Sequence, residues 1–217
     1  MAPLQLIIGN KAYSSWSLRP WLLMRHTGIE FSEIRLPLYT TEWQKTIGRY
    51  SPTGKVPVLI DGAVTAWDSL AICEYLAEKY PDLNLWPTAF GARAVARAVS
   101  AEMHSGFSDL RSEMPMNTRR RIPGKSFGSD AAADITRVIS IWNDLRSRYG
   151  EREPFLFGKF SIADAMFAPV VSRFETYSVA LDGAAARYAK VILDLPAMHT
   201  WYTEAQSETE AIASYEL

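Results

Sequence analysis

The chain has 217 residues, of which 48% are hydrophobic and 22% charged, and its 23 Lys and Arg against 24 Asp and Glu give a net charge of -1. This length allows one large or two small domains with a substantial core, and the near-neutral charge argues against nucleic acid or an anionic membrane as a partner. The single cysteine, Cys73, excludes an internal disulfide and any CxxC motif, and three scattered histidines predict no metal site. Because the first residues carry no cationic segment and no apolar run reaches the roughly 18 residues of a membrane span, we expect a cytoplasmic protein.

Strand and helix signals alternate over the first 80 residues. Short apolar runs bounded by turn residues predict strands, and apolar residues repeated every three or four positions predict helices. The predicted elements are, in order, a strand at 4–9, a helix at 17–27, a strand at 31–36, two short strands joined at Asp61 and Gly62, and a helix at 68–80. We therefore predict a compact α/β domain over residues 1–82.

The remainder of the chain has helical periodicity only. Prolines and a glycine interrupt the pattern between residues 80 and 91, so we place a linker at 83–90 and an α-helical bundle at 91–217. One long helix is expected at about 89–113 and another at 130–149. Three arginines between them, Arg119, Arg120 and Arg121, are interpreted as a solvated connection without a function.

Three short motifs in the first domain carry a resemblance to a known family. They are YSSWSLR at a strand-to-helix junction, KVPVL at the start of the hairpin and DSLAI at the start of the next helix. In this order and spacing they resemble the glutathione transferase family, over essentially the whole chain. The resemblance implies a thioredoxin-like first domain, an all-helical second domain, glutathione as co-substrate, no metal, and a homodimer.

The resemblance also implies which residues hold glutathione. Val56 would pair its backbone with the cysteinyl unit, as a peptide adds to a strand edge, and Pro57 after it would be cis. Asp68 and Ser69 match the pair that holds the γ-glutamyl group, and Lys55 matches a position near the glycine end. Asp68 and Ser69 also suit a helix cap, which is their plain structural interpretation.

The YSSWS segment resembles the SSCSWR segment of the zeta class and of related bacterial serine-type transferases, which places Ser14 against the glutathione sulfur. A hydroxyl there donates a hydrogen bond to the thiolate and so favours the ionised form. Ser15 is the alternative donor, and Tyr13 is kept in view because other classes use a tyrosine. Ser17 is expected to be the N-cap of the helix.

The helical domain is expected to supply the site of the electrophile. Its candidates are His104, Phe107 and Arg111, although Met103 and Phe107 have a spacing that is more typical of core. Ser161 and Asp164 in FSIADAMFAP match a folding signature of the family, and their spacing is that of a capping box, so we assign them a structural role.

Two other functions stay open at this point. A glutathione-dependent isomerase of the maleylacetoacetate type is disfavoured because Trp16 stands where the zeta class has a cysteine, and Thr176 falls on an arginine of that class, although Arg173 lies one turn earlier. A non-catalytic interaction module is disfavoured because the serines and both binding pairs are retained. Disulfide chemistry at Cys73 is disfavoured because that residue is on an apolar helix face.

Overall fold

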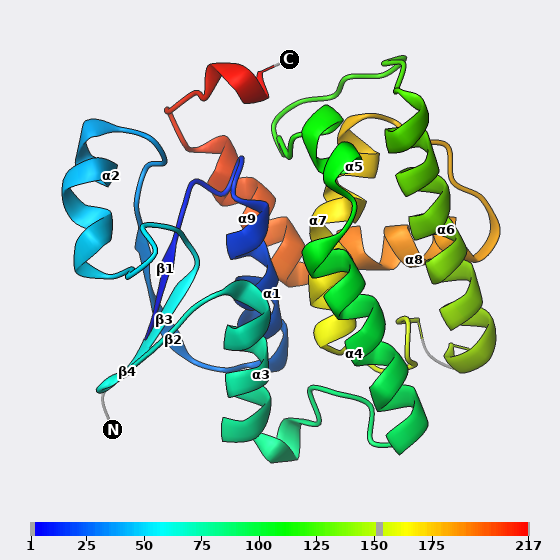
Figure 1. Cartoon of the computed structure of the whole chain (residues 1–217), viewed down its shortest axis with the longest axis horizontal. Helices are drawn as coiled ribbons and strands as arrows, with labels where there is room; N and C mark the ends of the chain where they lie inside the picture. Colours follow the sequence, from blue (N-terminus) through cyan, green and yellow to red (C-terminus); the bar gives the residue numbers. More distant parts are fainter. Residues whose placement is uncertain (1–2, 151–153, 217) are drawn as a thin grey trace.

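The first part of the chain is built on a four-stranded sheet in the order β2-β1-β3-β4 (Figure 1). The computed structural model describes residues 3–150 and 154–216. The strands are β1 (Leu4–Ile8), β2 (Phe31–Arg35), β3 (Val58–Asp61) and β4 (Val64–Ala66). β1 and β2 are parallel and are joined through helix α1 (Ser15–Thr27), whereas β3 is antiparallel to both β1 and β4. These four strands are those that the sequence predicts.

Alternate residues of β1 face two different layers of helices. Leu6 and Ile8 belong to the main core together with α1 and α3 (Ser69–Lys79), while Ile7 packs on the opposite face with Trp43 of the short helix α2 (Thr41–Thr46). This follows from the two-residue period of a strand. The sheet therefore has helices on both faces, and Figure 1 shows α2 apart from α1 and α3.

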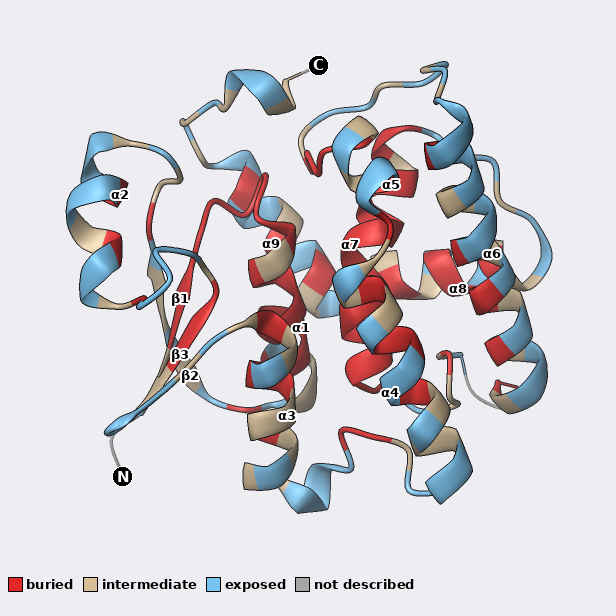
Figure 2. Ribbon diagram, in the orientation of Figure 1, coloured by how far each residue is buried: buried red, intermediate tan, exposed pale blue. Residues whose placement is uncertain are grey.

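The second part of the chain is helical, as predicted. Its helices are α4 (Phe90–Ser105), α5 (Ser108–Glu113), α6 (Ser129–Tyr149), α7 (Ile162–Thr176), α8 (Gly183–Leu193) and α9 (Pro196–Gln206). Helix α7 lies at the centre, because it packs against both α1 and α4 and all its residues except Glu175 are buried (Figure 2). One continuous hydrophobic core thus joins the sheet helices to the bundle.

The single long helix expected at about 89–113 is in fact two helices. Helix α4 stops at Gly106, where a Cβ atom would lie 2.8 Å from the carbonyl oxygen of Glu102, and Phe107 has a left-handed backbone with φ 58°. Helix α5 then begins at Ser108 in a new direction. The prediction was wrong here because the apolar periodicity runs through the break, and Arg111 consequently lies on α5.

Helix α7 begins with the predicted capping box. The Asp164 carboxylate accepts hydrogen bonds from the Ser161 amide at 2.8 Å, from the Ser161 hydroxyl at 3.0 Å and from the Leu156 amide at 3.0 Å. Burial raises the pKa of Asp164 to about 6, against the opposite influence of these hydrogen bonds. The pair therefore joins the helix start to the segment before it, which agrees with the structural role expected for both residues.

No helix among residues 3–150 and 154–216 is long and apolar enough to cross a membrane.

Candidate active site

A pocket of about 500 Å³ opens between the sheet domain and the helical bundle. Both candidate serines, Ser14 and Ser15, line it from the start of α1, and Lys55 and Val56 line it from the segment before β3. Arg173 of α7 belongs to the helical side of the same pocket. The serine motif and the VP motif, about 40 residues apart in sequence, are therefore brought to one cavity.

A second pocket of about 380 Å³ adjoins the first, since Lys55, Val56 and Trp16 line both. Asp68 and Ser69 line this second pocket. All four residues that the resemblance assigns to glutathione binding thus surround two connected cavities. A ligand that spanned them would pass along Val56.

The Val56–Pro57 peptide bond is cis, as the resemblance implies, and the Trp67–Asp68 bond is cis as well. Asp68 is the N-cap of α3, because its Oδ1 accepts hydrogen bonds from the amides of Leu70 at 3.0 Å and Ala71 at 3.3 Å. The cap that the sequence suggests is thus present. The Asp68 Oδ2 atom lies 2.8 Å from Nε2 of His104, which reaches across from α4.

Ser14, and not Ser17, occupies the N-cap position of α1. Ser17 is fully buried inside the first turn, and its Oγ accepts hydrogen bonds from the Gly9 amide at 3.2 Å and from the Ser14 hydroxyl at 2.7 Å. The expectation that Ser17 caps the helix is therefore wrong. The helix starts earlier because the Ser14 carbonyl accepts from the amide of Leu18.

Ser15 is held by the opposite side of the pocket. Its Oγ accepts a hydrogen bond of 3.2 Å from Nη2 of Arg173. The same guanidinium donates to the carbonyl oxygen of Met114 at 2.7 Å and to that of Pro169 at 3.3 Å. All three acceptors are neutral, so the positive charge of Arg173 is not compensated by them.

Three guanidinium groups gather around Ser15 and the neighbouring Trp16. Arg19 stacks on the Trp16 ring at 4.2 Å, Arg111 lies 5.5 Å from the same ring, and Arg173 contacts Ser15. Burial and the neighbouring cations lower the pKa of Arg19 to about 9 and that of Arg173 to about 10. Within the described parts of the chain, no carboxylate forms an ion pair with any of the three. The pocket is therefore positively charged and suited to anions.

The three candidates for the electrophile site lie in different places. Arg111 lines the larger pocket, and His104 lines the smaller one beside Asp68, where burial lowers its pKa. Phe107 is 7% exposed and belongs to the main core, to which Met103 also belongs. Phe107 lines neither pocket. Only Arg111 of the three therefore faces the cavity that holds the serines.

Sequence reasoning overlooked the aromatic walls of the larger pocket. Tyr39 and Tyr215 line it, although no local pattern singles out either residue. Arg119 was also misinterpreted: its guanidinium donates to the Tyr13 hydroxyl and to the carbonyl oxygens of Glu208 at 2.7 Å and Glu210 at 3.0 Å. It is thus an anchor for the C-terminal segment and not part of a solvated connection.

Cys73 is fully buried in the main core, and burial raises the pKa of its thiol. A neutral buried thiol is a poor nucleophile. In residues 3–150 and 154–216 there is also no group of three His, Cys, Asp or Glu side chains that could hold a metal ion.

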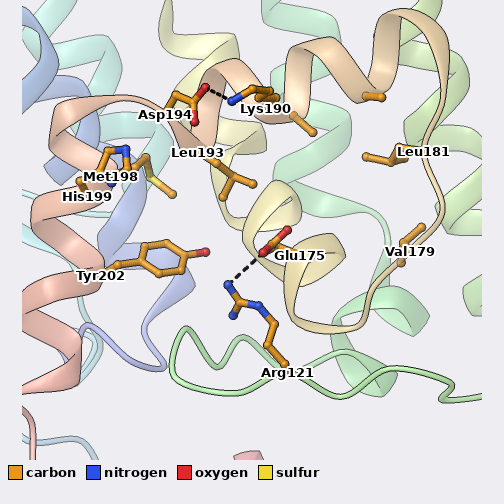
Figure 3. A pocket seen from close by; sticks show the side chains of 12 residues that line it. Arg121, Glu175, Val179, Leu181, Lys190, Leu193, Asp194, Met198, His199 and Tyr202 are labelled. Atoms are coloured by element: carbon orange, nitrogen blue, oxygen red, sulfur yellow. Dashed lines mark hydrogen bonds and ion pairs between the residues drawn. The ribbon is translucent and has the colours of Figure 1, made fainter.

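Another cavity, of about 570 Å³, lies wholly within the helical part between Arg121 and Tyr202 (Figure 3). Its charged side chains pair with one another, Arg121 with Glu175 at 2.9 Å and Lys190 with Asp194 at 2.6 Å. None of the candidate site residues lines it. The candidate active site is therefore the pair of adjoining pockets lined by the serine, VP and DS motifs.

Comparison with known proteins identifies the family to which the chain belongs. A family model described as the N-terminal domain of glutathione S-transferase matches residues 13–79, and one described as the C-terminal domain matches residues 129–204. A probable maleylacetoacetate isomerase of Caenorhabditis elegans is 25% identical over 199 residues, which cover 90% of this chain and 91% of that protein. Dichloromethane dehalogenase of Methylophilus leisingeri is 43% identical, but only over 65 residues, 29% of this chain and 24% of the dehalogenase.

The fold is shared with solved structures as well. A glutathione transferase homologue from Burkholderia GL BGR1, crystallised with bound glutathione, has a TM-score of 0.73 at 23% identity, with 95% of this chain and all of that chain covered. The two matched domains, their order and this fold together establish that the chain belongs to the glutathione S-transferase family of enzymes.

Proposed function

We propose that the protein binds glutathione in an extended form across the two connected pockets and transfers its thiolate to a small electrophile. The observation that carries the proposal is that Ser14 and Ser15, at the start of α1, open into the same cavity as Val56 and its cis peptide bond. Val56 would pair with the cysteinyl backbone, and Lys55 would face the glycine carboxylate. The family resemblance further implies that the enzyme would work as a homodimer.

Asp68 and Ser69 would hold the γ-glutamyl group in the smaller pocket. Oδ1 of Asp68 is used by the helix cap, while Oδ2 faces His104 and is the atom available to an ammonium group. Ser69 is fully buried at the first position of α3, and its Oγ accepts from Arg19 at 3.4 Å. The Ser69 hydroxyl and the Ser69 backbone amide, which the Asp68 cap does not use, would bind the carboxylate of the same group.

Ser14 would donate the hydrogen bond that stabilises the thiolate. Its hydroxyl donates to Ser17 in the structure, and a rotation about one bond would turn the proton to the sulfur. Ser17 would then donate to the Ser14 oxygen while it still accepts from the Gly9 amide. Such a chain of hydrogen bonds polarises the terminal donor. A bond to a charged acceptor contributes about 1.5 to 3 kcal/mol, which lowers the thiol pKa by about one to two.

Ser15 is the second candidate for this role, because Arg173 already donates to its oxygen and leaves its own proton available. Titration of the thiolate absorbance of bound glutathione distinguishes the two serines. The unmodified protein should ionise the thiol well below its usual pKa of about 8.5, and Ser14→Ala should abolish the shift. If only Ser15→Ala abolishes it, Ser15 is the donor. If bound glutathione keeps an ordinary pKa, the transferase mechanism is wrong and the protein is a binding module.

A second candidate function is glutathione-dependent isomerisation of a carboxylate-bearing substrate, the activity for which the C. elegans relative is named. The observation in its favour is Arg173, which faces the pocket and has no carboxylate partner among the described residues. Trp16, in place of the cysteine of the zeta class, disfavours it. Incubation of the protein with maleylacetoacetate and catalytic glutathione tests it. Isomer formation without consumption of glutathione would favour this function, whereas a stable conjugate would favour transfer.

A further inference from the structure

The segment that follows α9 returns to residues 10–13, the loop directly before Ser14, which we call the serine loop. Residues 207–216, which we call the C-terminal strap, run from the end of α9 to the same end of the molecule as the loop 10–13 between β1 and α1 (Figure 1). Tyr215 of the strap packs on the Tyr13 ring at 5.7 Å, and the Tyr13 hydroxyl bonds to Glu216. Residues about 200 positions apart therefore meet directly before Ser14.

Glu208 makes the most direct contact between the strap and this loop. Its side chain is 5% exposed, and its carboxylate accepts hydrogen bonds from two consecutive backbone amides, Lys11 at 2.6 Å and Ala12 at 3.0 Å. Arg35 of β2 lies 3.7 Å from the same carboxylate. Bonds from two successive amides to one carboxylate fix the plane of the intervening peptide, because each bond prefers a nearly linear geometry.

The other backbone groups of the loop are fixed by the helical domain. Trp201 of α9 donates to the Lys11 carbonyl at 2.8 Å, and the Thr118 amide donates to the Ala12 carbonyl at 3.1 Å. The Ser14 amide in turn donates to the Asn10 carbonyl at 2.8 Å. The Lys11 and Ala12 carbonyls are thus bonded by Trp201 of α9 and by the segment between α5 and α6, whereas the two amides depend on a single side chain of the strap.

We propose that Glu208 is a positioning residue for the serine hydroxyls, and that it acts through the Lys11 and Ala12 amides to set the direction in which Ser14 presents its proton to the thiolate. This inference rests on the proposed function, because it assumes that a serine donates to glutathione. Glu208 itself touches neither pocket in the structure. Its effect would therefore appear in the ionisation of bound glutathione, and not in the contacts that hold the peptide.

Glu208→Gln tests the inference, with Glu204→Gln as its matched control. Glu204 also binds Lys11, but through the side-chain amine, so its replacement removes a nearby charge without touching the loop backbone. The measurement is the pH titration of the thiolate absorbance of bound glutathione. We expect Glu208→Gln to raise the thiol pKa of bound glutathione by about one. At a pH below the thiol pKa, this rise means a roughly tenfold loss of thiolate. The KM for glutathione should change little. Glu204→Gln should leave the thiol pKa as it is.

A double variant separates positioning from general loosening of the fold. Glu208→Gln combined with the serine variant that abolishes the pKa shift should give no further rise, because both changes remove the same hydrogen bond. An additive rise, or an unchanged pKa in Glu208→Gln, would overturn the inference. Glu208→Asp keeps the charge but is one methylene shorter. The thiol pKa of glutathione bound to this variant should lie between that in the unmodified protein and that expected for Glu208→Gln, and it can be measured even if the glutamine variant does not fold.

These outcomes are distinguishable from failure of the proposed function. If neither serine variant alters the pKa of bound glutathione in an otherwise unmodified protein, the proposed function fails and the inference fails with it. If a serine variant removes the shift while Glu208→Gln keeps it, only the role of Glu208 is wrong.

Discussion

Replacement of Arg173 by methionine should leave stability nearly unchanged while it weakens anion binding in the pocket. Burial lowers the pKa of Arg173 from its ordinary value to about 10, which corresponds to a cost of about 3 kcal/mol for the charged form in the folded protein. For a base whose pKa falls on folding, this cost is fully present below the folded value and disappears only as the pH rises from about 10 towards the ordinary arginine pKa. At pH 7 the whole cost is therefore present.

The hydrogen bonds of the guanidinium offset that cost. They reach Met114, Pro169 and Ser15, all neutral acceptors, and each contributes about 1 kcal/mol. The two effects nearly cancel, so Arg173→Met should change the free energy of unfolding by no more than about 1 to 2 kcal/mol. Breaking a buried ion pair would instead cost about 3 to 5 kcal/mol, because an unpaired carboxylate would remain.

Two measurements on Arg173→Met test this reasoning. Urea unfolding at pH 7 gives the free energy of unfolding. Competitive binding compares the affinities of two ligands: glutathione sulfonate, which carries an anion in place of the thiol, and S-methylglutathione, which has a neutral group at that position. The unmodified protein should prefer the sulfonate, and the variant should lose at least about tenfold of that preference, equivalent to about 1.4 kcal/mol. A loss of stability above about 3 kcal/mol with an unchanged preference would show that Arg173 is a structural cation.

Three further outcomes follow from the described contacts. Asp164→Ala should lower the free energy of unfolding by about 3 kcal/mol or more, because it leaves buried donors of Ser161 and Leu156 without acceptors. Ser161→Ala should lower it by only about 1 kcal/mol. Equal losses of the two variants in urea titrations would contradict the capping box. Cys73 should react with a thiol reagent only as fast as the protein unfolds, since it is fully buried; rapid labelling of the native protein, followed by absorbance, would contradict this. Glutathione should alter the fluorescence of Trp16, because this residue lines both pockets. Trp16→Phe should lose most of the fluorescence change although six other tryptophans remain. An undiminished fluorescence change in this variant would place the ligand elsewhere.

The strands and most helices were predictable because their signals are local. The apolar run of β1 and the turn at Asp61 and Gly62 determine their own conformations, and the structure has them as predicted. The break between α4 and α5 was not predictable from periodicity, because Phe107 is apolar and continues the helical pattern while its backbone is left-handed. That conformation is favoured by the packing of Phe107 into the main core, which is a tertiary effect.

The residues of the candidate site also fall into two groups, those with a local sequence signal and those placed only by the packing of the whole fold. Ser14, Val56 and Asp68 belong to contiguous motifs, and motifs retain their spacing whatever the rest of the chain does. Arg173 and Glu208 reach the serine loop only through the packing of α7 and the path of the strap, so their partners depend on the whole fold. Arg119 shows the same limitation: the three neighbouring arginines look alike in sequence, yet only Arg119 donates to the Tyr13 hydroxyl among the described residues, while Arg121 pairs with Glu175.

The way in which the serine loop is held also determines when it can form during synthesis. Its amides and carbonyls bind residues 118, 201 and 208, so the loop is synthesised well before the groups that fix it. Contacts between such distant positions carry a large loop-closure entropy and form late in folding. A nascent chain that stops before residue 201 would therefore present unsatisfied amides next to Ser14, and the proposed thiolate binding would be acquired only after residue 208 has been translated.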